Sequence, residues 1–196
     1  MKLTKLQLKQ IIKEEVGGAV LDQQLGKGLE GLASNFQKQA KAAIQKGKDQ
    51  EKVEEAVGVT FAMSIALAAP AIMTMVSGAA KLVNKSIKKI SGNESEAVKS
   101  FANWMRKNGD SLHHKYTDFF TAIAKNVFMV KDDRADEVGK AMYYLLVAGL
   151  AVQSGLAAKH AAQHAHVPLG MMEGALAAIK SGEVGQFIVQ IAQGVA

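Results

Sequence analysis

Histidine is the residue type whose spacing in this chain comes nearest to a chemical site. The segment KHAAQHAHVP places His160 and His164 four residues apart on one helix face, and His166 follows at the helix end. Two imidazoles at this spacing can chelate a transition metal. No third ligand follows at a recognised spacing, and surface histidines near a helix C-terminus are favoured by the helix dipole. We therefore expect no metal site, and His160 and His164 are the only candidates for one.

A second group of ionisable residues surrounds His113 and His114, with Asp110 and Asp118 nearby. Adjacent side chains on a helix point in different directions, so the two imidazoles cannot serve one site by themselves. We expect one of the two histidines to be exposed and the other to be packed against the protein.

The remaining chemical patterns are weaker. The segment GKGLEG (residues 26–31) matches a GxGxxG phosphate loop, but no apolar strand precedes it and no acidic partner follows at the required distance. No GxSxG elbow is present. Cysteine is absent, which excludes disulfides, thiolate metal ligands and a thiol nucleophile, and fits a reducing compartment. We expect a non-enzymatic protein without a cofactor.

Apolar residues recur at spacings of three and four through most of the 196 residues, and alternation of period two is not sustained anywhere. The sequence therefore predicts an all-α fold, a helical bundle around a central uncharged helix. We expect turns at Asn108-Gly109 and at Ser181-Gly182, where glycine follows a helical pattern.

The chain opens with MKLTKLQLKQIIKEEVGG, a short amphipathic helix with a complete set of start signals. Thr4 and Gln7 have the capping-box spacing. Its apolar stripe, a predicted interaction surface, comprises Leu3, Leu8, Ile11 and Ile12. We expect the helix to stop at a hinge formed by Gly17-Gly18, which divides the chain into a leader helix (1–17), a loose amphipathic helix with a charged connection (18–55) and a helical core domain (56–196).

Two runs lack charged residues, residues 56–80 and residues 141–158. The first is long enough to cross a bilayer. It is rich in alanine, contains Pro70 and lacks aromatic belts at both ends, which favours the central helix of a soluble bundle. In that arrangement, the apolar stripes at 112–127 and 184–191 cover it. The alternative is a helix that enters a membrane.

The formal net charge is +6, and the positive excess lies in the middle of the chain. The residues available for phosphates or an anionic surface are Lys81, Lys85, Lys88, Lys89, Arg106 and Lys107. Such contacts predict weak binding to nucleic acid without sequence preference. The alternative is an ordinary solvated face.

The opening MKLTKLQLKQIIKEE resembles the leader segments of proteins from tailed bacteriophages, particularly marine and T-even-like ones. In that family a maturation protease cuts after Ile-x-Glu or Leu-x-Glu, which Ile12-Lys13-Glu14 matches, although Glu15 follows where the family prefers Gly or Ala. The resemblance covers some 15 residues and implies a protein of the virion or of capsid assembly, located in the virion or the host bacterial cytoplasm.

The resemblance also implies that the partners are other protein chains, either virion or capsid components or further copies of this one. The alternative is a membrane-active helical protein of the bacterial inner membrane, either a holin-like pore or an ejected virion protein.

Overall fold

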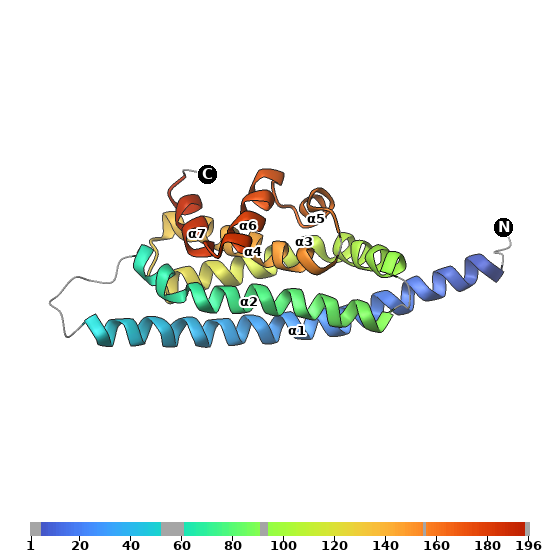
Figure 1. Cartoon of the computed structure of the whole chain (residues 1–196), viewed down its shortest axis with the longest axis horizontal. Coiled ribbons are helices and arrows are strands. Elements are labelled where there is room, and N and C mark those ends of the chain that lie inside the picture. Colours follow the sequence, from blue (N-terminus) through green and yellow to red (C-terminus); the bar gives the residue numbers. More distant parts are fainter. Residues whose placement is uncertain (1–4, 52–60, 91–93, 155, 195–196) are drawn as a thin grey trace.

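The computed structural model describes the backbone of residues 5–51, 61–90, 94–154 and 156–194; within these ranges the side chains of residues 5–17, 48–51, 89, 90, 94, 95, 97 and 153 are not described. The all-α prediction is confirmed, because the described residues form helices and no strand (Figure 1). The helices are α1 (Lys5–Glu51), α2 (Phe61–Ile90), α3 (Glu94–Asn126), α4 (Asp132–Ser154), α5 (Ala158–His164), α6 (Leu169–Ser181) and α7 (Val184–Ala192).

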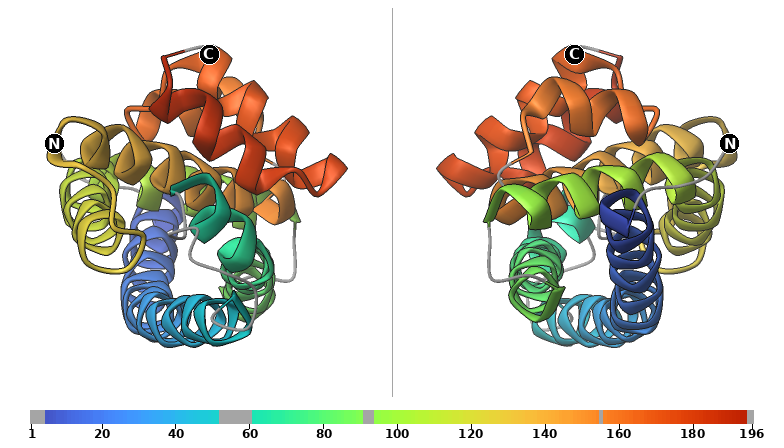
Figure 2. Two further views of the ribbon diagram at one scale, coloured as in Figure 1. Left: turned by 90° about the vertical axis from the view of Figure 1, so that its left-hand side faces the viewer. Right: turned by 90° about the vertical axis from the view of Figure 1, so that its right-hand side faces the viewer.

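The two long N-terminal helices, α1 and α2, lie side by side and antiparallel. A Cβ atom added at Gly28 or Gly47 of α1 would meet Leu82 or Leu67 of α2, respectively, so early residues of α1 face late residues of α2. Helices α3 and α4 pack against this pair, and the three short helices cover the opposite side of α4 (Figures 1 and 2). The bundle therefore has an α1–α2 layer at one side and the α5–α7 group at the other.

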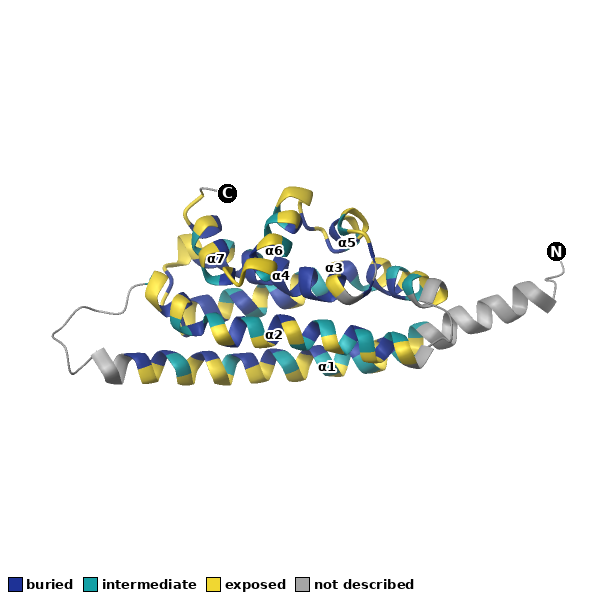
Figure 3. Cartoon of the chain, viewed as in Figure 1, coloured by how far each residue is buried: buried dark blue, intermediate teal, exposed yellow. Residues whose placement is uncertain are grey.

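The uncharged centre of the bundle is the second half of α4, from Ala141 onwards. Every residue from Ala141 to Ala151 is buried (Figure 3). Gly149 permits this packing, because a Cβ atom at that position would lie 2.8 Å from the carbonyl oxygen of Val76 in α2. The sequence favoured the first uncharged run (residues 56–80) as the central helix. The structure instead places part of the second run, Ala141 to Ala151, at the centre.

Helix α2 holds the described part of the first uncharged run and is buried on one side only. Ile65 and Ile72 are fully buried, whereas Ala66 and Pro70 are exposed. Its neighbours are mainly α1 and α4, with α7 also packed against it and α3 making a smaller contact. The predicted cover from residues 184–191 is confirmed, and α1 and α4 provide most of the remainder.

The expected hinge at Gly17-Gly18 is wrong, because α1 continues through both glycines. Each glycine costs about 1 kcal/mol relative to alanine in a helix. That cost is offset by tertiary packing of the next turns, where Leu21 and Leu25 are fully buried. The buried residues of α1 from Leu21 to Ile44 belong to the same hydrophobic core as the helices between residues 61 and 192. Over that range, the predicted segment 18–55 is therefore not separate from the predicted core domain.

The expected turn at Asn108-Gly109 is also wrong, since α3 runs through it without a break. Gly109 instead allows a close approach: a Cβ atom there would collide with the carbonyl oxygen of His164. The turn at Ser181-Gly182 is confirmed, and Gly182 ends α6 with a left-handed φ of 80°.

Two acidic side chains of α1 make polar contacts with α3. Asp22 Oδ1 accepts hydrogen bonds from the Trp104 indole N–H at 2.8 Å and from the Asn108 side-chain amide at 3.1 Å. Glu30 Oε1 lies 2.6 Å from Lys115 Nζ. The hydrogen bond and the charge of the Lys115 ammonium lower the pKa of the Glu30 carboxyl. The acidic side chains of α1 between Gly18 and Gly47 are therefore both engaged with α3.

Candidate interaction surfaces

The predicted docking stripe lies where the structure describes little. Leu3 is outside the described residues. Leu8, Ile11 and Ile12 lie within α1, but their side chains are not described. The stripe stays a prediction, with the single change that its backbone continues into the long helix instead of ending at a hinge.

The six predicted basic residues do not form one patch. Lys81, Lys85 and Lys88 lie on the exposed side of α2, whereas the side chain of Lys89 is not described. Lys107 of α3 faces α1, with its Nζ 4.0 Å from Asp22 Oδ2. Arg106 of α3 is close enough to His164 at the end of α5 to affect its pKa. The structure therefore groups the three α2 lysines and separates them from Arg106.

The histidines of α5 do not form a metal centre in the described part of the chain. His160 is exposed, and His164 is half-buried. No group of three or more His, Cys, Asp or Glu side chains within the described residues could hold a metal ion. For the His113–His114 pair, the expectation of one exposed and one packed histidine is confirmed. His114 is exposed, and His113 is half-buried with its Nδ1 atom fully covered.

A cluster that the sequence did not predict joins the end of α5 to α3 and α4. His166 Nε2 lies 2.6 Å from Asp110 Oδ1, and its ring centroid is 6.3 Å from that of His113. The His113 ring meets Tyr143 edge-on at 5.1 Å, and the Tyr143 hydroxyl donates a hydrogen bond to the Ala165 carbonyl at 2.9 Å. His166 has a left-handed φ of 54°, in the position after a helix that glycine usually occupies. The cluster thus anchors the turn after α5.

The electrostatics of this cluster favour neutral histidine at its centre. Burial lowers the pKa of His113, the nearby His114, His166 and Lys140 lower it further, and Asp110 opposes them. Burial and the charge of Arg106 likewise lower the pKa of His164, with His160 adding to the effect. Nδ1 of His113 has no hydrogen-bond partner among the described residues, so protonation there gains no acceptor to offset the repulsion.

We expect stability to fall as the pH drops below about 6.5, the ordinary histidine pKa. Below that pH the unfolded chain binds more protons than the folded one, because the folded-state pKa values of His113 and His164 are depressed, so acid favours unfolding. The melting temperature should be lower at pH 5.5 than at pH 7.5. A His113→Gln variant should show a clearly smaller difference. His160→Gln should stay closer to the wild type, because the charge of His160 is only the smallest of the three causes that lower the pKa of His164. A loss in His160→Gln as large as that in His113→Gln would contradict this assignment.

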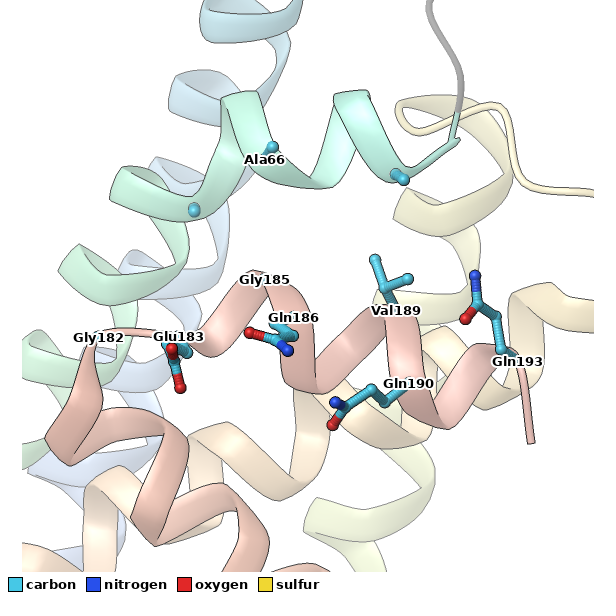
Figure 4. Close-up of a pocket in the computed structure, with 10 residues that line it drawn as sticks. Ala66, Gly182, Glu183, Gly185, Gln186, Val189, Gln190 and Gln193 are labelled. Carbon is cyan, nitrogen blue, oxygen red and sulfur yellow. The ribbon is translucent and has the colours of Figure 1, made fainter. Parts of the chain in front are cut away.

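An open groove of about 670 Å³ lies between the N-terminal half of α2 and α7 (Figure 4). Alanines of α2 form one wall, and Gln186 and Gln190 of α7, with Gln193 directly after it, line the other. Glu183 is the one ionisable side chain among the described residues that line it. A single carboxyl without an acid–base partner provides no catalytic pair, so the groove has contact surface to offer but no evident reaction chemistry.

Comparison with known proteins identified no relative of this chain. No protein-family profile matches the chain, and neither a curated protein nor a solved structure is significantly similar to it.

Proposed function

We propose that this chain is a non-enzymatic structural protein of a phage particle or of its capsid assembly, and that it acts by packing helices against other protein chains. The observation that carries the proposal is the continuity of α1. The segment that resembles a phage leader begins a 47-residue helix whose later part, from Leu21 onwards, is built into the core. A partner that binds the stripe of Leu8, Ile11 and Ile12 would thereby be linked to the bundle by a helix.

The packing of the bundle supports this proposal. The core is a continuous set of apolar side chains, and its buried polar side chains are serines, Ser64, Ser86 and Ser154. The ionisable side chains described above lie in ion pairs, on the surface or in the histidine cluster. Such a molecule is suited to binding through its surfaces.

A membrane-active protein is the second candidate, and one observation favours it. Phe61–Lys88 is long and apolar enough to cross a membrane by length and composition, and 39% of its most apolar window is buried inside the protein. The remainder of this helix includes partly buried residues packed against the core, among them Leu67 and Met73, and exposed ones. The aliphatic and small residues on the exposed side of α2 include Ala62, Met63 and Ala66.

Liposome flotation separates the two candidates. We expect the purified chain to remain soluble without detergent and to stay at the bottom of a density gradient with neutral phosphatidylcholine vesicles in 0.5 M salt, because the apolar side of α2 is occupied by α1, α4 and α7. The salt removes binding that rests on charge alone. Quantitative flotation under these conditions would replace the assembly proposal with the membrane-active one.

A further inference from the structure

Seven exposed lysines lie on the two helices of the α1–α2 layer, and we call them the lysine face. Four lie on α1 and three on α2: Lys27, Lys38, Lys41, Lys46, Lys81, Lys85 and Lys88. All seven are exposed, and none forms an ion pair with another described residue. At 1.5 Å per residue, the α1 lysines extend over about 28 Å.

Helix packing places the α2 lysines beside one end of this row. A Cβ atom at Gly28 would lie 2.8 Å from the Leu82 side chain, so Lys81 and Lys85 are level with the part of α1 around Lys27. Lys88 lies one turn further along α2. The lysine face therefore combines lysines of two helices that are 35 to 61 positions apart in the chain (Lys46 to Lys81 and Lys27 to Lys88).

No carboxylate competes for these lysines within the described part of the layer. Helix α2 contains no acidic residue. The acidic side chains of α1 between Gly18 and Gly47 are Asp22 and Glu30, which are held by Trp104 and Lys115 of α3, respectively. The lysine charges are thus left uncompensated on a surface whose acids point to its edge.

The exposed side chains of α1 are better suited to the phosphates of a nucleic acid than to a membrane surface. Besides lysine, the exposed polar side chains of α1 between Gly18 and Gly47 are Gln, Asn and Ser, together with Asp22 and Glu30, which contact α3. No apolar side chain larger than alanine is exposed there. A helix that binds a membrane surface buries bulky apolar residues at the headgroup boundary. Lysine with Gln, Asn and Ser is instead the set that contacts the sugar–phosphate backbone.

We propose that the lysine face binds duplex nucleic acid through its phosphates, without reading the base sequence. This binding goes beyond the proposed function and does not depend on it, because it follows from the exposed lysines alone. It also revises the residues expected from the sequence: the α1 lysines join Lys81, Lys85 and Lys88, while Arg106 and Lys107 are left out.

The test measures binding of two fluorescent 20-bp DNA duplexes of unrelated sequence by anisotropy, from 50 to 200 mM salt. We expect equal affinity for both duplexes and an affinity that falls with salt, with a log–log slope of about −0.9 for each phosphate neutralised. Four effective contacts would weaken binding on the order of a hundredfold over this range. Tight binding that is insensitive to salt, or a strong preference for one duplex, would overturn the proposal.

Two charge-matched variants locate the contact. The face variant carries Lys→Gln changes at Lys27, Lys81, Lys85 and Lys88, and the control carries them at the exposed lysines of other helices and loops, Lys99, Lys131, Lys159 and Lys180. Both lose four positive charges. We expect the face variant to reduce the magnitude of the salt slope by about one for each lysine that contacts a phosphate, with the control close to wild type.

A second face variant and three contrary results also test the proposal. A second face variant, with Lys→Gln at Lys38, Lys41 and Lys46, should reduce the slope by up to about three. Equal weakening in the face and control variants would show that net charge alone drives binding and would overturn the site. Absence of binding at 50 mM salt, or face-dependent binding to phosphatidylserine vesicles with none to duplex, would overturn the nucleic-acid assignment. Circular dichroism of each variant confirms that it is folded.

Discussion

Replacing Ile72 with lysine is expected to cause a large loss of stability. Ile72 is fully buried on the inner side of α2, within the hydrophobic core. A lysine there loses the burial of the isoleucine and places an ammonium group among apolar atoms with no carboxylate partner. We expect the free energy of unfolding to fall by about 4 kcal/mol or more, a large part of the stability of a typical domain. Urea unfolding followed by circular dichroism measures it.

The matched control is Ala66→Lys on the same helix. Ala66 is exposed, so its lysine would reach water and should change the free energy of unfolding by less than about 1 kcal/mol. The pair tests which side of α2 faces the protein. Greater damage from Ala66→Lys than from Ile72→Lys would mean that the exposed side is covered by a partner or by lipid, contrary to the packing described above.

The type of fold could be predicted because it follows from local pattern. The 3.6-residue period, the stop at Gly182 and the apolar side of residues 112–127 are each encoded within a few turns, and the structure contains all three. The same local evidence misplaced the centre of the bundle. Two uncharged runs satisfy the same criterion, and only long-range packing places α4, rather than α2, on the inside.

Glycine produced the two wrong helix ends for a physical reason. A glycine that ends a helix and a glycine that lets two helices approach look alike in one sequence. Gly109 belongs to the second kind, because its missing side chain is replaced by the carbonyl oxygen of His164, 55 positions away. Gly17 and Gly18 are carried through the helix by the packing that begins at Leu21.

The surface features depended on the same long-range information. Asp22 meets Trp104 across 82 positions, and Glu30 meets Lys115 across 85. In the sequence alone, residues 18–55 contain positive and negative charges in equal number, so the lysines of α1 do not indicate a basic surface. The spacing of Lys27 and Lys38, three helical turns apart, was a usable signal, but it becomes informative only once both acids are known to face α3.

Removal of residues 1–16 is expected to leave the bundle folded and to abolish its association with partner chains. The described buried side chains of α1 begin at Leu21, so every one of them remains in the shortened chain. We expect the melting temperature to change by no more than a few degrees, the shift that about 1 kcal/mol produces in a chain of this length. A large loss of stability would show that the stripe packs on this chain's own core.

Point variants separate the stripe from the rest of the segment. Leu8→Ser with Ile12→Ser removes two apolar side chains, whereas Lys9→Ser with Lys13→Ser changes the charged residue that directly follows each of them. We expect the first pair to prevent incorporation into particles assembled in infected cells and the second pair to permit it. Equal incorporation of both would remove the stripe as the docking surface.

The most direct measurement for the proposed function is quantitative mass spectrometry of phage particles purified from the natural source. We expect the chain to be present in fixed proportion to the other virion proteins, with a mature start at Glu15 if the Ile12-Lys13-Glu14 site is cut, or with an intact N-terminus if the segment serves only for docking. Absence of the chain from particles at every stage of assembly, together with its recovery in the host membrane fraction, would contradict the account.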